Sequence, residues 1–211
     1  PDLPAGTVAS RPGPLLARSS EVTASFTGRS AHIARYREGR DALGAAARFA
    51  VGAKWLSRKL EQEEPCTLRF GRMEAGTVRN AVAGSARVEG SLRVFSDDMF
   101  ARAQDEVRAL AQTAADEEGC TFDLHFSEGY PPVVNDGTLF GEAAQALPEL
   151  ERVPEPLLIA EDFAFYQRYL PGVFFLLGTG TGIPLHADTF NFDERVLLRG
   201  VRAYRQLLFG V

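Results

Sequence analysis

Residues 82–98, VAGSARVEGSLRVFSDD, join a long strand signal directly to the start of a helix. Polar and apolar residues alternate as far as Val94, which is the period of a strand with one buried face. The apolar positions are Ala86, Val88, Leu92 and Val94, and the polar positions are Arg87, Glu89, Ser91 and Arg93. Ser96 then offers an N-cap oxygen, and Asp97 and Asp98 suit the positive end of a helix dipole. This stretch predicts a half-buried strand followed at once by an amphipathic helix.

Similar signals lie on both sides of this stretch. Further alternating strands are expected over residues 21–28, 66–70 and 121–126, and helices over residues 41–61 and 97–119. From residue 21 to residue 126 the order is therefore strand, helix, strand, strand, helix, strand. Two split βαβ units of this kind form a four-stranded antiparallel sheet with both helices on one face, the ferredoxin-like arrangement.

The flanking segments have an α/β character. We expect a short strand over residues 6–10, a helix over 138–147, a loop over 148–156, a strand over 157–160, a helix from Glu161, a buried strand over 173–177 and a last helix over 193–209. The fold class is predicted as α/β, with an inserted α+β domain. Residues 1–20 and 129–211 are assigned to the α/β domain, and residues 21–128 to the ferredoxin-like insertion. The opening PDLPAG resembles the interior of a domain, so most of the N-terminal half of the α/β domain is expected outside this chain.

The composition is that of a globular protein, and it argues against several functions. The chain has 211 residues, 45% of them hydrophobic and 24% charged, with a formal net charge of −5. No block of Lys and Arg suits nucleic acid, and no apolar run approaches the roughly 18 residues of a membrane span. Cys66 and Cys120 lie far apart without metal-type spacing, so we predict free thiols and a cytoplasmic location.

Six short motifs follow one another along the chain. They are Gly28-Arg29-Ser30-Ala31-His32, Ala75-Gly76-Thr77-Val78-Arg79-Asn80, Gly129-Tyr130-Pro131-Pro132-Val133-Val134-Asn135, Ala160-Glu161-Asp162-Phe163, Pro171-Gly172-Val173-Phe174-Phe175-Leu176-Leu177-Gly178 and Pro184-Leu185-His186. In this order they resemble the metal-dependent amidohydrolases of the aminoacylase and carboxypeptidase-G-like superfamily. The most similar branch contains N-acetyldiaminopimelate deacetylases, hippurate hydrolases and auxin-conjugate hydrolases.

The resemblance implies hydrolysis of an N-acyl amino acid by a metal-activated water that attacks the amide carbonyl. It implies two divalent cations in the complete enzyme, either zinc or manganese, nickel or cobalt, with His186 as one ligand. Glu161 and Asp162 would support this site from the start of a helix, where carboxylates also suit the helix dipole. The ferredoxin-like domain would be a lid through which two copies form a homodimer.

The resemblance also assigns roles to residues of the lid. His32 would stabilise the oxyanion, while Asn80 and Arg93 would hold the carboxylate of the small-molecule substrate. Arg93 lies on the polar face of its strand, where a guanidinium is free to bind a carboxylate. Gly178 is interpreted as a point of close backbone approach to the substrate.

The chain departs from the family pattern in several places. Ile33-Ala34-Arg35-Tyr36-Arg37 follows His32 in place of Ala-Ala-x-Pro-His, and Ile159 replaces a common glycine. The family's other metal ligands and its catalytic glutamate lie upstream of the matched motifs, so we expect this chain to be inactive by itself. The alternative is a non-catalytic dimerisation or small-molecule-binding module, which predicts dimers and no divalent metal at His186.

Overall fold

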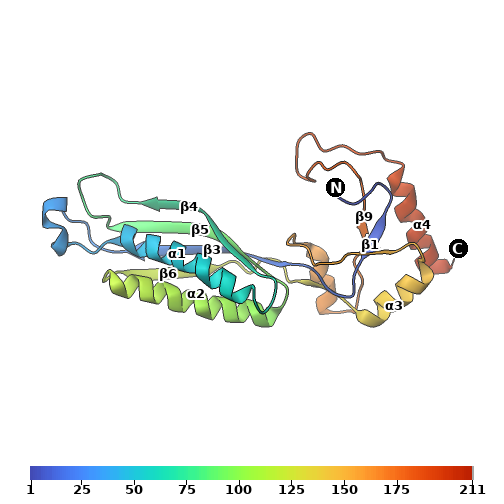
Figure 1. Cartoon of the computed structure of the whole chain (residues 1–211), viewed down its shortest axis with the longest axis horizontal. Helices are drawn as coiled ribbons and strands as arrows, with labels where there is room; N and C mark the ends of the chain where they lie inside the picture. The colour runs from blue at the N-terminus through green and yellow to red at the C-terminus, as the bar shows by residue number, and fades with distance from the viewer. Residues whose placement is uncertain (211) are drawn as a thin grey trace. The chain divides into compact units, whose positions relative to one another are not determined.

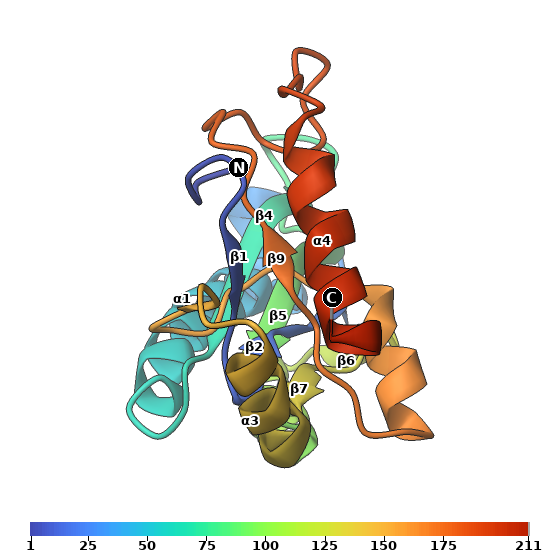
Figure 2. The same ribbon diagram turned by 90° about the vertical axis from the view of Figure 1, so that its right-hand side faces the viewer.

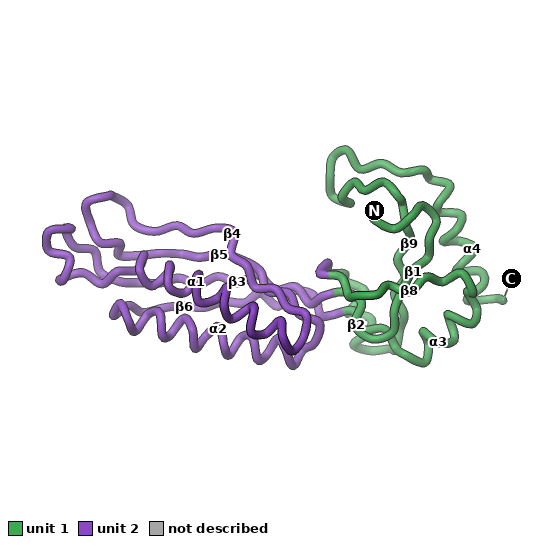
Figure 3. Tube along the Cα trace, viewed as in Figure 1, with its two compact units in different colours: residues 1–16, 133–157, 161–211 green, residues 17–132, 158–160 purple. Residues whose placement is uncertain are grey.

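The computed structural model describes residues 1–210 and divides them into two compact units (Figures 1 and 3). Unit 1 contains residues 1–16 and 133–157 and the chain from residue 161 onward. Unit 2 contains residues 17–132, together with residues 158–160. Because most of unit 2 lies between two parts of unit 1 in the sequence, it is an insertion into unit 1.

Unit 2 is built on a four-stranded antiparallel sheet with the strand order β4-β5-β3-β6. Its elements in chain order are β3 (Arg18–Thr27), η1 (Ile33–Glu38), α1 (Ala42–Leu60), β4 (Thr67–Ala75), β5 (Ser85–Val94), α2 (Asp97–Glu117) and β6 (Thr121–Phe126). Strands and long helices follow one another in the order expected from the sequence. Figure 1 shows α1 and α2 side by side along the sheet, and both helices contact its strands.

Local capping explains where these helices begin and end. The Ser96 hydroxyl accepts a hydrogen bond from the Met99 amide (3.1 Å), so the predicted N-cap is confirmed. Asp41 caps α1 in the same way, accepting from the Leu43 amide (3.0 Å). Gly119 follows α2 with a φ of +64°, a left-handed conformation that glycine adopts without a steric penalty.

The core of unit 2 lies between the sheet and the two helices. Phe26 on β3 and Phe49 on α1 are fully buried, and their ring centroids lie 5.6 Å apart. Phe70 on β4 adds a second contact, 5.2 Å from the Phe49 ring. Burial of one such side chain contributes about 1.5–3 kcal/mol, so this continuous cluster is the main source of stability for unit 2.

Arg18 is a buried charge that the sequence interpretation did not identify. It lies on the buried face of β3, in register with Ser20 and Val22, and is only 9% exposed. Its guanidinium donates to the Asp97 carboxylate (2.9 Å) and to the Glu128 carbonyl (3.0 Å). These bonds tie the first turn of α2 to both ends of the inserted chain. β3 begins at Arg18 rather than at the expected Glu21 because the backbone pairing with β5 already starts at Arg18, opposite Val94.

Unit 1 has smaller sheets. Its elements are β1 (Val8–Ser10), β2 (Gly13–Leu16), β7 (Val133–Asn135), α3 (Gly137–Ala146), β8 (Glu151–Arg152), η2 (Asp162–Arg168), β9 (Leu176–Leu177) and α4 (Val196–Phe209). β1 pairs in parallel with β8 and antiparallel with β9, and β2 pairs with β7. Figure 2 shows α4 beside β9 and β1, and α4 contacts β1.

Two strand predictions in the C-terminal part of the chain are wrong. Residues 157–160 do not form a strand: Leu157 makes a single bridge to Leu16, and the Ile159 carbonyl accepts from the Ala17 amide (2.9 Å). The predicted loop over residues 148–156 contains the two-residue strand β8, which pairs with β1. Residues 173–177 are half-buried rather than buried, because only the last two form a strand and that strand pairs with β1 alone.

Within the described residues, no helix has both the length and the apolar character needed to cross a membrane.

The two cysteines are buried and unpaired. Burial is the main cause that raises the pKa of the Cys66 thiol from 9.0 to about 11. Since the folded protein holds this proton more tightly than the unfolded chain, the stabilisation is complete below pH 9 and is lost as the pH rises toward 11. We therefore expect the free energy of unfolding to fall more steeply over this range in the native protein than in Cys66→Ala. Urea denaturation at a series of pH values measures both slopes, and equal slopes would contradict the prediction.

Candidate functional site

His32 and Asn80 lie together at one end of unit 2. The Ile33 amide donates to the Asn80 carbonyl (2.9 Å), and His32 pairs with Ala81 in an antiparallel bridge. Both side chains are exposed. We call residues 28–40 and 76–84 the tip, which lies at the left end of the sheet in Figure 1, where β3 ends and β5 begins. The structure thus brings together two of the three residues predicted for the lid.

The orientation of the His32 ring is set by a local hydrogen bond. Its Nδ1 accepts from the Ala34 amide (3.2 Å) at the start of η1. A ring nitrogen that accepts carries no proton, so the neutral imidazole holds its proton on Nε2. The exposed Nε2–H is therefore a donor, which is the chemistry needed to stabilise an oxyanion.

Arg93 lies at the opposite end of β5. It pairs with Ser19 and Thr67, is half-buried, and donates to the Leu158 carbonyl (3.1 Å). Eight residues of strand, or about 27 Å, separate it from Ser85 at the tip end of β5. Within one chain, Arg93 is therefore not brought to His32 and Asn80.

In unit 1, Gly178 begins the segment that leads to His186. Its amide donates to Thr7 (2.8 Å), and a Cβ at this position would lie 2.1 Å from the Pro4 carbonyl oxygen, so only glycine fits. The Gly182 amide then donates to the Pro1 carbonyl (3.3 Å). The close backbone approach at Gly178 is thus to the first residues of the chain, and contact with a substrate stays a prediction.

His186 is exposed on a loop that follows this segment. Two turns shape the loop, with the Ala187 amide donating to Pro184 (3.0 Å) and the Phe190 amide donating to Ala187 (2.9 Å). Among residues 1–210, no three His, Cys, Asp or Glu side chains lie together as a metal ion requires. The described residues therefore do not fit a divalent metal by themselves, and we derive no catalytic step through one.

Glu161 and Asp162 open η2. A Glu161 carboxylate oxygen accepts from the Asp162 amide (3.0 Å), so Glu161 caps this helix. Partial burial, followed by the neighbouring Asp162 carboxylate, raises the pKa of Glu161. Capping accounts for the pair structurally, and a role in supporting a catalytic site stays a prediction.

Sequence reasoning did not assign a role to the arginines of the tip. Five of them occur there, at positions 29, 35, 37, 40 and 79. The available signal was the segment Ile33-Ala34-Arg35-Tyr36-Arg37, where the chain departs from the family pattern. The sequence does not show that this segment pairs with the one that contains Arg79. In the structure the Ile33 amide donates to the carbonyl of Asn80, the residue after Arg79.

The chain has an antiparallel βαββαβ unit inserted into an α/β unit, so it belongs to the class of two-unit α/β proteins. It also carries a lone exposed histidine, His186, on a glycine-rich loop. Comparison of sequences identifies the family. Residues 1–209 match peptidase family M20/M25/M40, and the chain belongs to this family. The similarity to amidohydrolases inferred from the six motifs is thereby confirmed.

Curated relatives and solved structures agree with this assignment. The chain is 34% identical over 210 residues to an N-acetyldiaminopimelate deacetylase of Lacticaseibacillus casei, covering 96% of the chain and 55% of that relative. It is 33% identical to the Oenococcus oeni enzyme of the same name, covering 100% of the chain and 57% of the relative. The chain therefore spans about half the length of the curated relatives it matches.

Among solved structures, the Bacillus subtilis YxeP protein, described as a dinuclear metal-binding peptidase of the M20 family, gives a TM-score of 0.81 at 26% identity. That comparison covers 98% of the chain and 53% of YxeP. The aminopeptidase PepT of Bacillus cereus gives a TM-score of 0.78 at 20% identity, covering 99% of the chain and 54% of PepT, and it supports the fold alone.

Proposed function

We propose that the whole protein hydrolyses the amide bond of an N-acyl amino acid, as a deacylase of the deacetylase type. The observation that carries this proposal is the match to peptidase family M20/M25/M40 over residues 1–209, with relatives named as deacetylases. The geometry of the tip supports it, because the exposed Nε2–H of His32 is a donor for the oxyanion of an amide carbonyl under attack.

The proposed enzyme uses two divalent metal ions, zinc or manganese, nickel or cobalt. The description of YxeP as a dinuclear metal-binding peptidase supports this part of the proposal. His186 supplies one ligand, and the remaining ligands come from outside the 211 residues. The hydrogen bond from the Gly182 amide to the Pro1 carbonyl is relevant here, because any residue preceding Pro1 would enter beside the loop of His186.

Unit 2 serves in this proposal as a lid that forms a homodimer. Its His32 and Asn80 act on a substrate bound to a second copy, while Arg93 binds a carboxylate at the other end of the sheet. The two ends of β5 lie roughly 27 Å apart, so we expect His32 and Asn80 to contact the substrate at one place and Arg93 to bind its carboxylate at another. A cytoplasmic location is part of the same proposal, supported by the two unpaired cysteines.

The test is hydrolysis of N-acetyl amino acids by the whole protein, followed as release of the free amine, together with a substitution at the tip. We expect turnover by the whole protein and none by the isolated 211-residue polypeptide, in which the described residues offer no three-ligand group. His32→Ala should lower kcat about 100- to 1,000-fold with a smaller change in KM, because one oxyanion donor is lost. His32→Gln, which keeps an N–H donor, should retain part of this activity.

His125→Ala is the matched control, because His125 is an exposed histidine on β6 of the same unit. An unchanged kcat in His32→Ala, or an equal loss of kcat in His125→Ala, would show that His32 is not the oxyanion donor. Dimers that bind no metal and hydrolyse no N-acyl amino acid would favour the non-catalytic binding module instead.

A further inference from the structure

Unit 1 carries a groove between the C-terminal end of α3 and one side of α4. The groove has a volume of about 540 Å³, which lies in the range of small-molecule sites. One wall is formed by residues 145–149, and the other by Gln206 and three arginines of α4, Arg199, Arg202 and Arg205. Among the described residues that line it, Glu149 is the only carboxylate. The groove is therefore positively charged in a chain whose formal net charge is −5.

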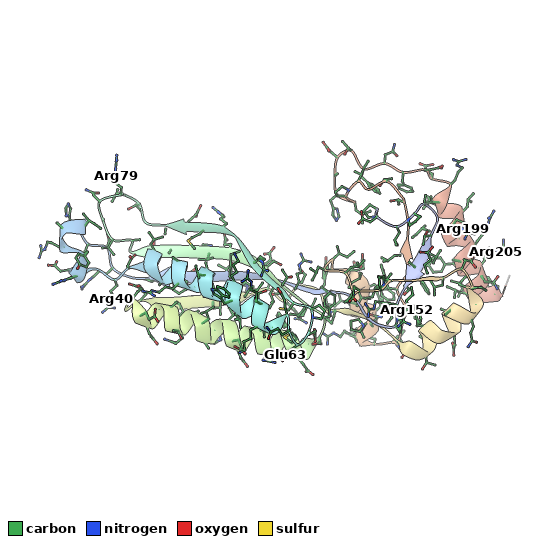
Figure 4. All side chains as sticks on the ribbon, viewed as in Figure 1. Arg40, Glu63, Arg79, Arg152, Arg199 and Arg205 are labelled. Atoms are coloured by element: carbon green, nitrogen blue, oxygen red, sulfur yellow. The ribbon has the colours of Figure 1, made fainter. Side chains whose placement is uncertain are left out.

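The spacing of the three arginines along α4 brings them to the same groove. They recur at every third residue, and side chains three residues apart on a helix are neighbours, with about 5–6 Å between their Cβ atoms. The rise of the helix separates Arg199 from Arg205 by about 9 Å along the axis. Figure 4 shows both of these residues on α4.

The backbone of α4 is held in place beside the groove. A Cβ at Gly200 would lie 3.2 Å from Cδ2 of Leu177 on β9, so another side of the helix packs closely against the sheet. The three guanidinium groups are thus presented from a fixed backbone, which lowers the entropy cost of binding a ligand.

The positive charge of the groove is only partly balanced. Nη2 of Arg199 lies 3.6 Å from Oε1 of Glu149, which is longer than a hydrogen bond. Arg202 and Arg205 form no ion pair with any of residues 1–210. The C-terminal end of α3 adds about half a negative charge, so the three arginine charges face about one and a half negative charges. An anion between Arg202 and Arg205 would relieve the repulsion of these neighbouring cations.

The arrangement favours a phosphate group over a carboxylate. A carboxylate has two oxygens, and one guanidinium satisfies both of them through parallel N–H···O bonds. A phosphate monoester carries a charge of about −1.5 to −2 and three acceptor oxygens, so it can accept from two guanidinium groups at once. Leu147 and Pro148 also line the groove and offer apolar surface to an organic substituent.

We propose that this groove binds a phosphate ester of a small organic molecule. The phosphate lies between Arg202 and Arg205, and the organic part lies beside Pro148. Neither His186 nor any residue of unit 2 lines the groove, so the inference goes beyond the proposed function and does not depend on it.

Isothermal titration calorimetry of the whole protein with phenyl phosphate tests this inference. Benzoate keeps the ring but replaces the phosphate by a carboxylate, and inorganic phosphate lacks the ring. We expect phenyl phosphate to bind at one site with a Kd below about 1 mM, at least about tenfold tighter than benzoate. Inorganic phosphate should bind more weakly than phenyl phosphate, because it makes no apolar contact.

Substitutions in the groove should change the Kd of phenyl phosphate in opposite directions. Arg202→Ala and Arg205→Ala should each raise it about 10- to 100-fold, because a charged hydrogen-bond donor is lost. Glu149→Gln should lower it about threefold or more, because this change removes a negative charge and frees Arg199. A variant that merely damages the fold cannot tighten binding, so Glu149→Gln separates a binding role from a structural one.

Two controls locate the binding. Arg195→Ala should leave the Kd within about twofold, because Arg195 pairs with Asp193 at the start of the same helix and does not line the groove. His186→Ala should do the same, which distinguishes the groove from metal ions that could hold phosphate at His186.

Several outcomes would overturn this inference. They are no binding of phenyl phosphate, tighter binding of benzoate, an unchanged Kd in Arg202→Ala and Arg205→Ala, an equal loss in Arg195→Ala, and loss of binding in His186→Ala. The proposed function would stand in each case, because none of these titrations measures amide hydrolysis.

Discussion

We expect His186→Ala to abolish the proposed hydrolysis by the whole protein and to lower its content of divalent metal. A catalytic metal is typically held by about three protein ligands, so loss of one imidazole leaves too few donors. The substitution should not disturb the loop, because the His186 side chain is exposed and the loop is shaped by backbone turns. Removal of an exposed side chain changes stability by no more than about 0.5 kcal/mol, so the fold should survive the substitution.

Metal content by mass spectrometry and kcat by amine release should be measured on the same preparations. Asp188→Ala, an exposed neighbour on the same loop, is the control and should keep both metal and activity. A chelator should reduce the native protein to the level of His186→Ala, and added metal should restore only the native protein. Full activity and full metal content in His186→Ala would show that this histidine is not a ligand.

We expect Gly129→Ala to destabilise unit 2 by about 3 kcal/mol or more. Gly129 has a φ of +57°, a left-handed conformation in which an added Cβ is strained. That Cβ would lie 1.6 Å from the Ser19 carbonyl oxygen, which is backbone and cannot move aside cheaply. Relief of the clash would disturb the neighbouring hydrogen bond from the Ser19 amide to the Tyr130 carbonyl (3.2 Å).

Urea denaturation followed by circular dichroism measures this loss. Gly71→Ala is the control in the same unit, because Gly71 has no positive φ and no atom within 4 Å of its added Cβ. We expect Gly71→Ala to lie within about 0.5 kcal/mol of the native protein. If both substitutions have the same effect, the left-handed backbone conformation of Gly129 does not contribute to the stability of unit 2.

Much of unit 2 was predictable because its signals are local. Alternation over residues 85–94 defines β5 and its buried face, and the Ser96 side chain lies three residues before the amide that it caps. Unit 1 was less predictable. Its strands β8 and β9 have two residues each, too few for alternation to show, and β8 exists because β1 lies beside it.

Some features of the candidate site were likewise predictable from the sequence, and others were not. The order of six motifs is a property of the sequence, and it was sufficient to place the chain in its family. It also singled out His32, Asn80, Arg93 and His186 as candidates. It could not show that His32 and Asn80 are neighbours while Arg93 lies at the far end of β5.

Local chemistry therefore accounts for what could be known from the sequence: the helix caps, the alternating strands and the family. Tertiary structure was needed for the burial of Arg18 and for the pairing of the two segments of the tip. The physical reason is that these features depend on hydrogen bonds between residues dozens of positions apart, such as Arg18 to Glu128 and Ile33 to Asn80. Such contacts form only when the sheet brings the segments together, and they leave no periodic signal along the chain.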